Sequence, residues 1–181
     1  MVELSLHILD IVQNSIQANA NEIEIKVLES TLDNLYRIVI KDNGKGMDVE
    51  TLKKLDDPFF TTKNKKTGLG LPLLKQQCEA CNGTLTINSL LALGTEIEAT
   101  FELNHWDRQP MGNIRDTLIG FFRSFEDISF KYVHKTDEGS FEIGNKEILE
   151  TLDGLSIQNK EVIDFLKHMI DENLKAIEAE E

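Results

Sequence analysis

Four short stretches in which apolar and polar residues alternate dominate the first hundred positions of this chain. They read NEIEIKV at 21–27, YRIVIK at 36–41, TLTINS at 84–89 and TEIEATFEL at 95–103. A period of two places every second side chain on one face of a strand, so each stretch predicts a strand with one buried and one polar face. Strands of this kind form antiparallel sheets that expose one side to water.

Helical periodicity fills the intervals between these strands. Residues 5–19 carry apolar side chains at intervals of three and four, and shorter helices are expected at 47–57 and 71–80. The segment 59–70 is polar, lysine-rich and contains glycines, so it predicts a loop. We therefore predict an α+β fold: a two-layer α/β sandwich with a mixed, mostly antiparallel sheet and helices on one face.

A change of composition marks the end of this region. The stretch NHWDRQPMG at 104–112 contains a proline and a glycine, which indicates a linker. Beyond it we expect an amphipathic helix, a two-stranded hairpin and two closing helices from about Lys146 and Lys160. We therefore assign 1–104 to one domain and 105–181 to a small C-terminal α+β region for docking or dimerisation.

The charge of the chain limits its partners. Its 181 residues are 40% hydrophobic and carry a net charge of −13. This acidity disfavours broad binding to nucleic acid or an anionic membrane, although a few converging lysines still allow a small anionic ligand. No apolar run approaches the about 18–20 residues of a membrane span, and the start lacks the basic and apolar segments of a signal peptide. We expect a cytoplasmic protein with no nucleic-acid or membrane partner.

The stretch DNGKGM at 42–47 directly follows the second predicted strand. Taken alone, it is compatible with an ordinary surface turn, because Asp, Asn and Gly favour turns. A calcium loop of the EF-hand type needs an oxygen ligand at its third position and a glutamate at its twelfth. This chain has Gly44 and Lys53 there, which excludes that interpretation. A nucleotide-binding loop built around the Asp42 carboxylate is the remaining alternative.

Other motifs accompany this stretch in a fixed order. They are Asn14 within DIVQNSIQA, then DPFFTTK at 57–63, TGLGL at 67–71 and GTEIEATF at 94–101. Together with DNGKGM they resemble the N, G1, F, G2 and G3 boxes of the GHKL (Bergerat-fold) ATPases. That superfamily includes gyrase, the heat-shock chaperone, histidine kinases and the mismatch-repair ATPases. The resemblance covers about residues 5–103 and implies a histidine-kinase-like ATP-binding domain.

The resemblance assigns an adenine site to several of these residues. It implies that Asp42 accepts a hydrogen bond from the adenine amino group, which favours adenine over guanine because a carboxylate only accepts. It implies that Gly44 and Gly46 let the backbone lie against the base, with Met47 beside them, and that Thr95 lies near the adenine through a water.

ATP and Mg²⁺ are the cofactors that the resemblance implies, with Asn14 as the magnesium ligand. TGLGL is not a Walker loop, because no Gly-Lys-Ser/Thr follows, and it lacks the third glycine of a dinucleotide fingerprint. It precedes a helix, whose N-terminal N–H groups can face phosphate oxygens. The residues expected to contact phosphate are Gly68, Leu69, Gly70 and Leu71, with Lys63 and Lys65 of the preceding loop as a lid.

One position departs from part of the superfamily. Gyrase-like and mismatch-repair members carry a glutamate four residues before the asparagine, where it activates water or a hydroxyl. This chain has Asp10 there, and we predict it to be the catalytic base, although its shorter side chain must still reach the proton that it takes. His7 lacks the surroundings of a phospho-acceptor box, and the chain starts at the first motif, so we expect a helix-face histidine. Cys78 and Cys81 lack two further zinc ligands and are expected to pack in the core.

Two functions follow from the resemblance. The first is an enzyme that transfers the γ-phosphate of Mg·ATP to a protein, or hydrolyses it, in a regulatory role similar to that of the anti-sigma-factor serine kinases or a histidine-kinase catalytic domain. The second is a non-catalytic or slow ATP-dependent switch that binds a partner protein. A DNA-acting ATPase is disfavoured by the charge of −13. A protein partner or phospho-acceptor is expected in both cases, and a homodimer is possible.

Overall fold

The computed structural model describes residues 3–54, 70–152 and 154–180. The helices are α1 (Leu4–Gln17), α2 (Val49–Lys54), α3 (Gly70–Ala80), α4 (Ile114–Ser124), α5 (Asn145–Thr151) and α6 (Lys160–Ala176). The strands are β1 (Glu22–Ser30), β2 (Leu35–Asp42), β3 (Leu85–Leu90), β4 (Gly94–Glu102), β5 (Ser129–Lys135) and β6 (Ser140–Gly144). Every strand and helix expected from the sequence is present among the described residues, and the expected end of the helix at 47–57 lies outside them.

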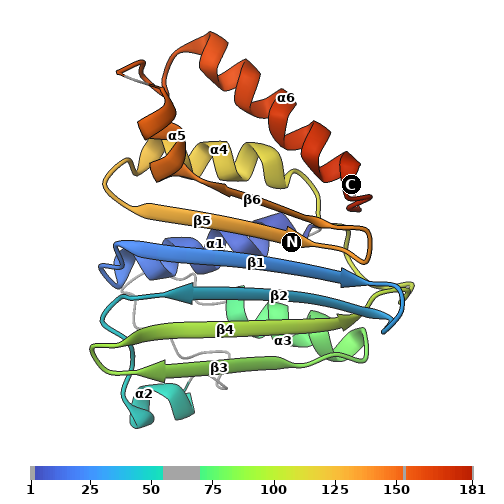
Figure 1. Cartoon of the computed structure of the whole chain (residues 1–181). Helices are drawn as coiled ribbons and strands as arrows, with labels where there is room; N and C mark the ends of the chain where they lie inside the picture. The colour runs from blue at the N-terminus through green and yellow to red at the C-terminus, as the bar shows by residue number, and fades with distance from the viewer. Residues whose placement is uncertain (1–2, 55–69, 153, 181) are drawn as a thin grey trace.

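The described strands form one six-stranded sheet in the order β3-β4-β2-β1-β5-β6 (Figure 1). Strands β1 and β5 pair in parallel, and all other neighbours are antiparallel. In the centre, Ile25 of β1 lies opposite Ile40 of β2 on one side and Tyr132 of β5 on the other. The predicted α+β fold with a mixed, mostly antiparallel sheet is confirmed.

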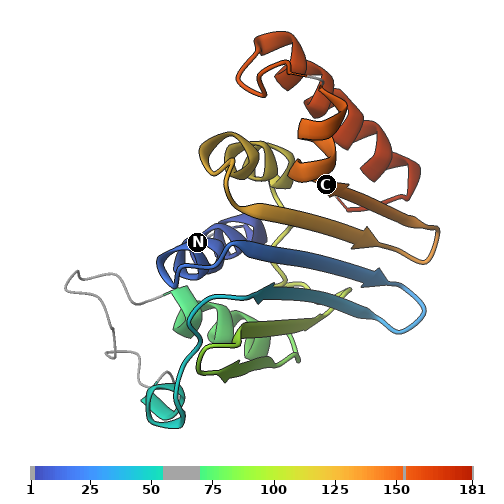
Figure 2. The same cartoon turned by 60° about the vertical axis from the view of Figure 1, so that its left-hand side comes forward.

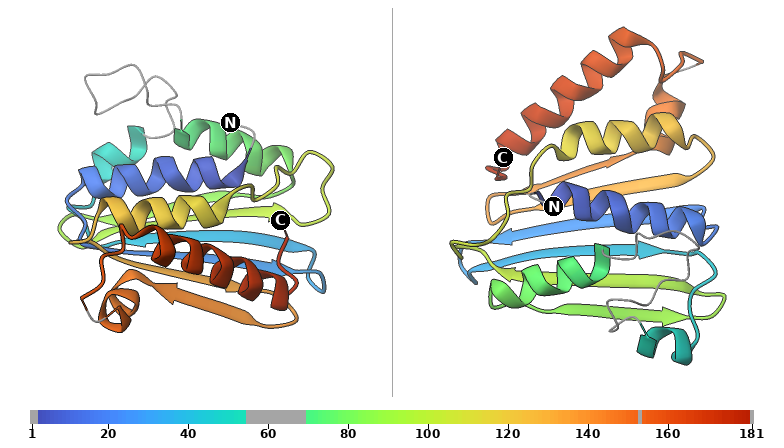
Figure 3. Two further views of the ribbon diagram at one scale, coloured as in Figure 1. Left: turned by 90° about the horizontal axis from the view of Figure 1, so that it is seen from above. Right: turned by 180° about the vertical axis from the view of Figure 1, so that it is seen from behind.

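Helices α1, α3 and α4 cover the same face of the sheet (Figure 3). The alternation of the strands explains this arrangement, because the fully buried apolar side chains of β1 and β2, such as Ile25 and Ile40, point to that face. The opposite face carries charged side chains such as Glu24, Lys26 and Arg37, of which Glu24 and Lys26 form an ion pair of 2.7 Å. The two-layer arrangement predicted from the sequence is therefore confirmed.

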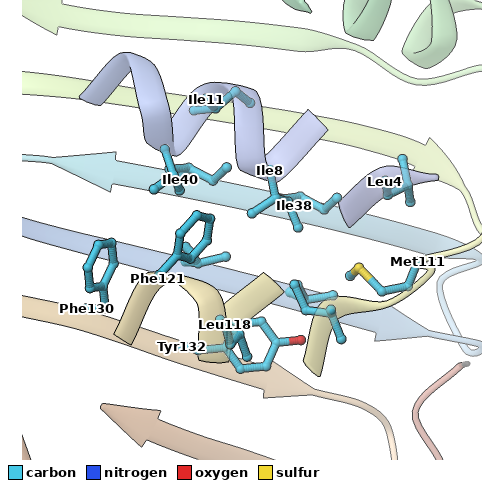
Figure 4. Packing of buried hydrophobic residues seen from close by; sticks show 14 of the residues in the cluster. Leu4, Ile8, Ile11, Ile38, Ile40, Met111, Leu118, Phe121, Phe130 and Tyr132 are labelled. Carbon is cyan, nitrogen blue, oxygen red and sulfur yellow. The ribbon is translucent and has the colours of Figure 1, made fainter. Parts of the chain in front are cut away.

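The core lies between this face and the helices (Figure 4). Ile8 and Ile11 of α1 lie over β2, and Phe121 of α4 stacks on Phe130 of β5 with ring centroids 5.4 Å apart. Fully burying a side chain of this size stabilises the fold by roughly 1.5–3 kcal/mol. The same core joins α1 and α4, although these helices are separated by about a hundred positions in the chain.

The linker and the C-terminal segment join the region of the first four strands. Backbone N–H groups of Leu4 and Ser5 donate to the carbonyls of Pro110 and Met111, so the linker runs beside the start of α1. Strands β5 and β6 then extend the sheet beyond β1, and α6 packs against α4. The boundary after residue 104 and the docking role of 105–181 stay predictions. No helix in the described part of the chain is long and apolar enough to cross a membrane.

Candidate nucleotide-binding site

Asp42 ends β2 and its carboxylate is fixed by two donors. The Ser15 hydroxyl donates to one oxygen at 2.7 Å, and the backbone N–H of Gly44 donates to the other at 2.8 Å. Ser15 is 3% exposed and Asp42 8% exposed, so water competes little for these bonds. The Ser15 oxygen also lies 3.3 Å from the Ile11 carbonyl. One hydroxyl has a single proton, and the shorter, charge-assisted bond to Asp42 is the one that it makes.

The loop after Asp42 packs tightly at both of its glycines. A Cβ added at Gly44 would lie 2.9 Å from the Ala18 carbonyl oxygen at the end of α1. Gly46 has φ +63°, and a Cβ there would lie 1.9 Å from the Leu90 carbonyl oxygen. Between them, the Lys45 N–H donates to the Ala18 carbonyl at 2.8 Å. The loop is thus held between α1 and the β3–β4 turn, which requires glycine at residue 46 whatever the loop binds.

A serine orients the first residues of β4 beside this loop. Ser89 Oγ donates to the Gly94 carbonyl at 2.9 Å and accepts from the Met47 N–H at 2.9 Å. It also lies 2.9 Å from Thr95 Oγ1. Because the Ser89 proton is already engaged, Thr95 must be the donor in this last bond. The Thr95 oxygen therefore presents only lone pairs, next to Asp42, which is its partner across the β2–β4 ladder.

Asp10, Asn14 and the first residue of α3 form a second group along α1. The Asn14 amide nitrogen donates to Asp10 Oδ2 at 3.4 Å, one helical turn away. A Cβ added at Gly70 would lie 1.9 Å from that same Asp10 oxygen, so the backbone at the start of α3 touches the carboxylate. All three residues are half-buried. This close approach explains why residue 70 is glycine.

Both groups lie at one end of the sheet. Helix α2, the first turn of α3, the C-terminal half of α1 and the end of β2 meet there (Figure 2). The structure thus brings together a list of predicted residues: Asp10, Asn14, Asp42, Gly44, Gly46, Met47, Gly70, Leu71 and Thr95, of which Leu71 is partly buried against the core. The predicted residues Lys63, Lys65, Gly68 and Leu69 lie outside the described residues.

Sequence reasoning missed Ser15 and Ser89. Ser15 stands next to Asn14, and a small hydroxyl on the buried side of a helix is a weak pattern by itself. Ser89 is the last inward-facing residue of β3, where the preceding inward positions are Leu85 and Ile87. A polar residue that replaces an apolar one at the end of an alternating strand would have been the clue.

The histidine and the two cysteines considered in the sequence analysis are buried in the interior. His7 is 3% exposed, and burial lowers the pKa of its imidazole, partly offset by Gln109 and Asp10. Cys78 and Cys81 are both buried in the core, as predicted. Burial raises the pKa of Cys78 to about 12, and it also raises the pKa of Cys81. No cluster of three or more His, Cys, Asp or Glu that could hold a metal occurs among the described residues.

The sequence matches a known protein family. Residues 2–105 match the family described as histidine kinase-, DNA gyrase B-, and HSP90-like ATPase. A putative sensor protein of Shewanella frigidimarina is 36% identical over 103 residues, which cover 55% of this chain and 16% of that protein. The sensor protein kinase FleS of Pseudomonas aeruginosa is 45% identical over 89 residues, covering 49% and 22%. The matched segments thus span less than a quarter of these relatives.

Solved structures share the fold. The ATPase domain of Aquifex aeolicus MutL, complexed with ADP, aligns with a TM-score of 0.50 and 14% identity, covering 93% of this chain and 88% of that one. The N-terminal domain of a DNA repair protein aligns with a TM-score of 0.53 and 17% identity, covering 80% and 52%. At such identities the likeness concerns the fold alone.

Proposed function

Because the chain belongs to the histidine kinase-, DNA gyrase B- and HSP90-like ATPase family, we propose that it binds Mg·ATP and transfers the γ-phosphate to a protein, or hydrolyses it. The family match supports ATP binding and a kinase-type role. Two similar proteins, the sensor protein kinase FleS and the sensor histidine kinase YvrG of Bacillus subtilis, favour transfer to a protein. A regulatory role follows for a domain of this type.

The observation that carries the proposal is the buried Asp42 carboxylate. Ser15 and Gly44 each occupy one of its oxygens, and each oxygen keeps further acceptor capacity. An adenine amino group is a donor of the kind that such a carboxylate accepts, whereas guanine has a carbonyl at that ring position. The lone pairs of Thr95 beside it can accept from a water that also contacts the base. The carboxylate favours adenine, and the Thr95 acceptor would hold the bridging water.

Asn14 fits a magnesium site in its chemistry. An amide oxygen is a hard oxygen ligand of the kind that Mg²⁺ takes, usually with phosphate oxygens and waters completing its shell. Bound Mg²⁺ would neutralise charge on the phosphates. The first turn of α3 touches Asp10 at Gly70, so its backbone N–H groups face the same region, where Gly68, Leu69, Lys63 and Lys65 are proposed to complete the phosphate contacts.

Asp10 decides what happens to the γ-phosphate. As a general base it would take a proton from water or from an acceptor hydroxyl. Its Oδ2 accepts from Asn14 at 3.4 Å, a long bond that fixes the carboxylate only loosely and leaves its second oxygen for the proton. The second candidate function is a slow or non-catalytic switch, and the substitution of aspartate for the longer glutamate is the feature that favours it.

Calorimetric titration with ATP and GTP in the presence of Mg²⁺ tests the binding step. Asp42→Asn converts one acceptor oxygen to a donor, so we expect ATP affinity to fall about 10- to 150-fold. Asp127→Asn, at an exposed position, serves as the matched control. Equal affinity of wild type for ATP and GTP would contradict the adenine site.

Turnover separates the two functions. If Asp10→Asn abolishes phosphate release or protein phosphorylation while ATP affinity stays within about twofold, Asp10 is the base and the enzyme proposal stands. If the wild-type chain binds ATP and neither releases phosphate nor phosphorylates a protein, the chain acts as the switch.

A further inference from the structure

A groove opens between α5, α6 and β6, in the C-terminal part of the chain. Its volume is about 400 Å³. Its floor is apolar and is formed by Ile143, Ile148, Val162 and Leu166, each no more than 9% exposed. The groove is lined by residues of β6, whereas Asp42 ends β2. Strands β1 and β5 lie between β2 and β6 in the sheet (Figure 1). It is therefore separate from the nucleotide site.

A single large aromatic side chain stands at the edge of this groove. Phe165 of α6 is 66% exposed, although it lines the groove beside Met169 one turn later. Aromatic side chains that line a groove and remain accessible are frequent anchors of protein interfaces. On α6, Glu161, Phe165 and Met169 are spaced by four residues, so they form one stripe along the groove wall. A helix lying in the groove would contact this stripe along its length.

Every charged side chain that lines the groove in the described part of the chain is acidic. These are Glu142, Glu147 and Glu161. Glu142 pairs with Lys131 at 2.6 Å, which leaves Glu147 and Glu161 as the main source of negative charge at the rim. Lys146 and Lys160 belong to the same two helices but do not line the groove.

From this combination we propose that the groove binds an amphipathic helix of another protein whose apolar face is flanked by lysine or arginine. The apolar floor and Phe165 would take hydrophobic residues spaced by three and four, as in other complexes of a helix in a groove. The rim glutamates would face the flanking cations and raise the rate of encounter. The proposal goes beyond ATP binding and does not depend on it.

Charge also argues against two other occupants. An anionic membrane surface would be repelled by Glu147 and Glu161. A second copy of this chain would bring a further charge of −13 to an acidic rim. A cationic segment is the occupant whose charge complements both the rim and the whole chain.

Three synthetic peptides of about 16 residues test the proposal by fluorescence anisotropy. The first carries leucines at helical spacing with flanking lysines, the second has the same leucines with flanking glutamates, and the third keeps the lysines with the leucines scrambled. We expect the first to bind at least tenfold more tightly than either of the others, with an affinity that falls between about 50 and 500 mM salt. Equal binding of the first two would overturn the role of the rim.

Variants of the full chain locate the binding. Phe165→Ser should weaken the first peptide at least tenfold, and Glu147→Gln with Glu161→Gln should weaken it several-fold and remove most of its salt dependence. Leu32→Ser is the control, because Leu32 is 86% exposed on the β1–β2 turn far from the groove. Unchanged binding in Phe165→Ser would refute the groove.

Two further measurements make the failures distinguishable. Asp42→Asn should bind the first peptide as wild type does, even when its ATP affinity is lost, so failure of the proposed function leaves this result in place. Light scattering should show a monomer with the peptide bound. A dimer of the chain that the peptide disperses would show that a second copy occupies the groove instead, and would overturn the proposal.

Discussion

Replacing Ser15 by alanine would leave the Asp42 carboxylate with one donor instead of two. The lost bond is 2.7 Å long, charge-assisted and almost sealed from water, since the two residues are 3% and 8% exposed. Losing a hydrogen bond to a charged group costs about 1.5–3 kcal/mol. Alanine recovers a few tenths of a kcal/mol as the better helix former. We expect a net loss of about 1–2.5 kcal/mol in the free energy of unfolding.

Urea denaturation measures this loss, and ATP titration measures its effect on binding. A carboxylate with one donor has more freedom to rotate, so ATP affinity should fall by about tenfold, in the same direction as for Asp42→Asn but by less. Ser124→Ala, at the exposed end of α4, is the control and should change the free energy of unfolding by no more than about 0.5 kcal/mol.

The coupling between the two residues is the decisive quantity. In a double-mutant cycle, Ser15→Ala and Asp42→Asn should show an interaction energy of at least about 0.5–1 kcal/mol, because the first removes the bond and the second takes away the charge that strengthens it. If the effects simply add, or if Ser15→Ala resembles Ser124→Ala, then Ser15 does not fix the Asp42 carboxylate and the description of the site is wrong.

Four further substitutions, one of them a control, test other features. Gly46→Ala should cost more than about 1–2 kcal/mol of stability, since φ is +63° and the new Cβ meets a carbonyl oxygen at 1.9 Å, whereas Gly120→Ala on open helix surface should stabilise by about 0.5–1 kcal/mol in urea denaturation. Burial lowers the pKa of His7 below its usual 6.5, so the folded chain favours the neutral imidazole. The contribution of His7 to stability is therefore present above about pH 6.5 and lost as the pH falls below that value. His7→Leu should reduce this loss, as measured by unfolding curves across that pH range. Gly70→Ala would press its Cβ to 1.9 Å from Asp10, so ATP turnover should fall more than about tenfold while the far-UV spectrum stays unchanged.

The part of the fold that is set by local pattern could be predicted from the sequence. The alternation in 21–27 and 36–41 shows which side chains face the core, and β1 and β2 form at these two stretches. No local pattern indicates that β5 pairs with β1, because Ser129 and Glu22 become neighbours only when the residues between them have folded. The hairpin of β5 and β6 was expected, but its place at the β1 edge was not.

The candidate site shows the same division. Asp42, Asn14 and the glycines lie in ordered motifs, so their types and spacing could be recognised. Ser15 and Ser89 act through contacts between separate elements, α1 with β2 and β3 with β4, and the sequence around them does not identify the partners in those contacts. The tight approach of Gly70 to Asp10 likewise joins two helices. Contacts of this kind between separate elements can be identified only in the folded structure.

The parallel pairing of β1 with β5 bears on how the chain is made. β1 emerges from the ribosome more than a hundred residues before the strand that covers its edge. In that interval β2 can pair with β1 on one side, but the other side of β1 offers unpaired N–H and C=O groups and can template pairing with another chain. Because these two strands are far apart in the sequence, a long loop must close before they pair, which slows folding. For a nascent chain in the cell, the arrival of residues 129–135 therefore marks the point at which the open edge of β1 is covered.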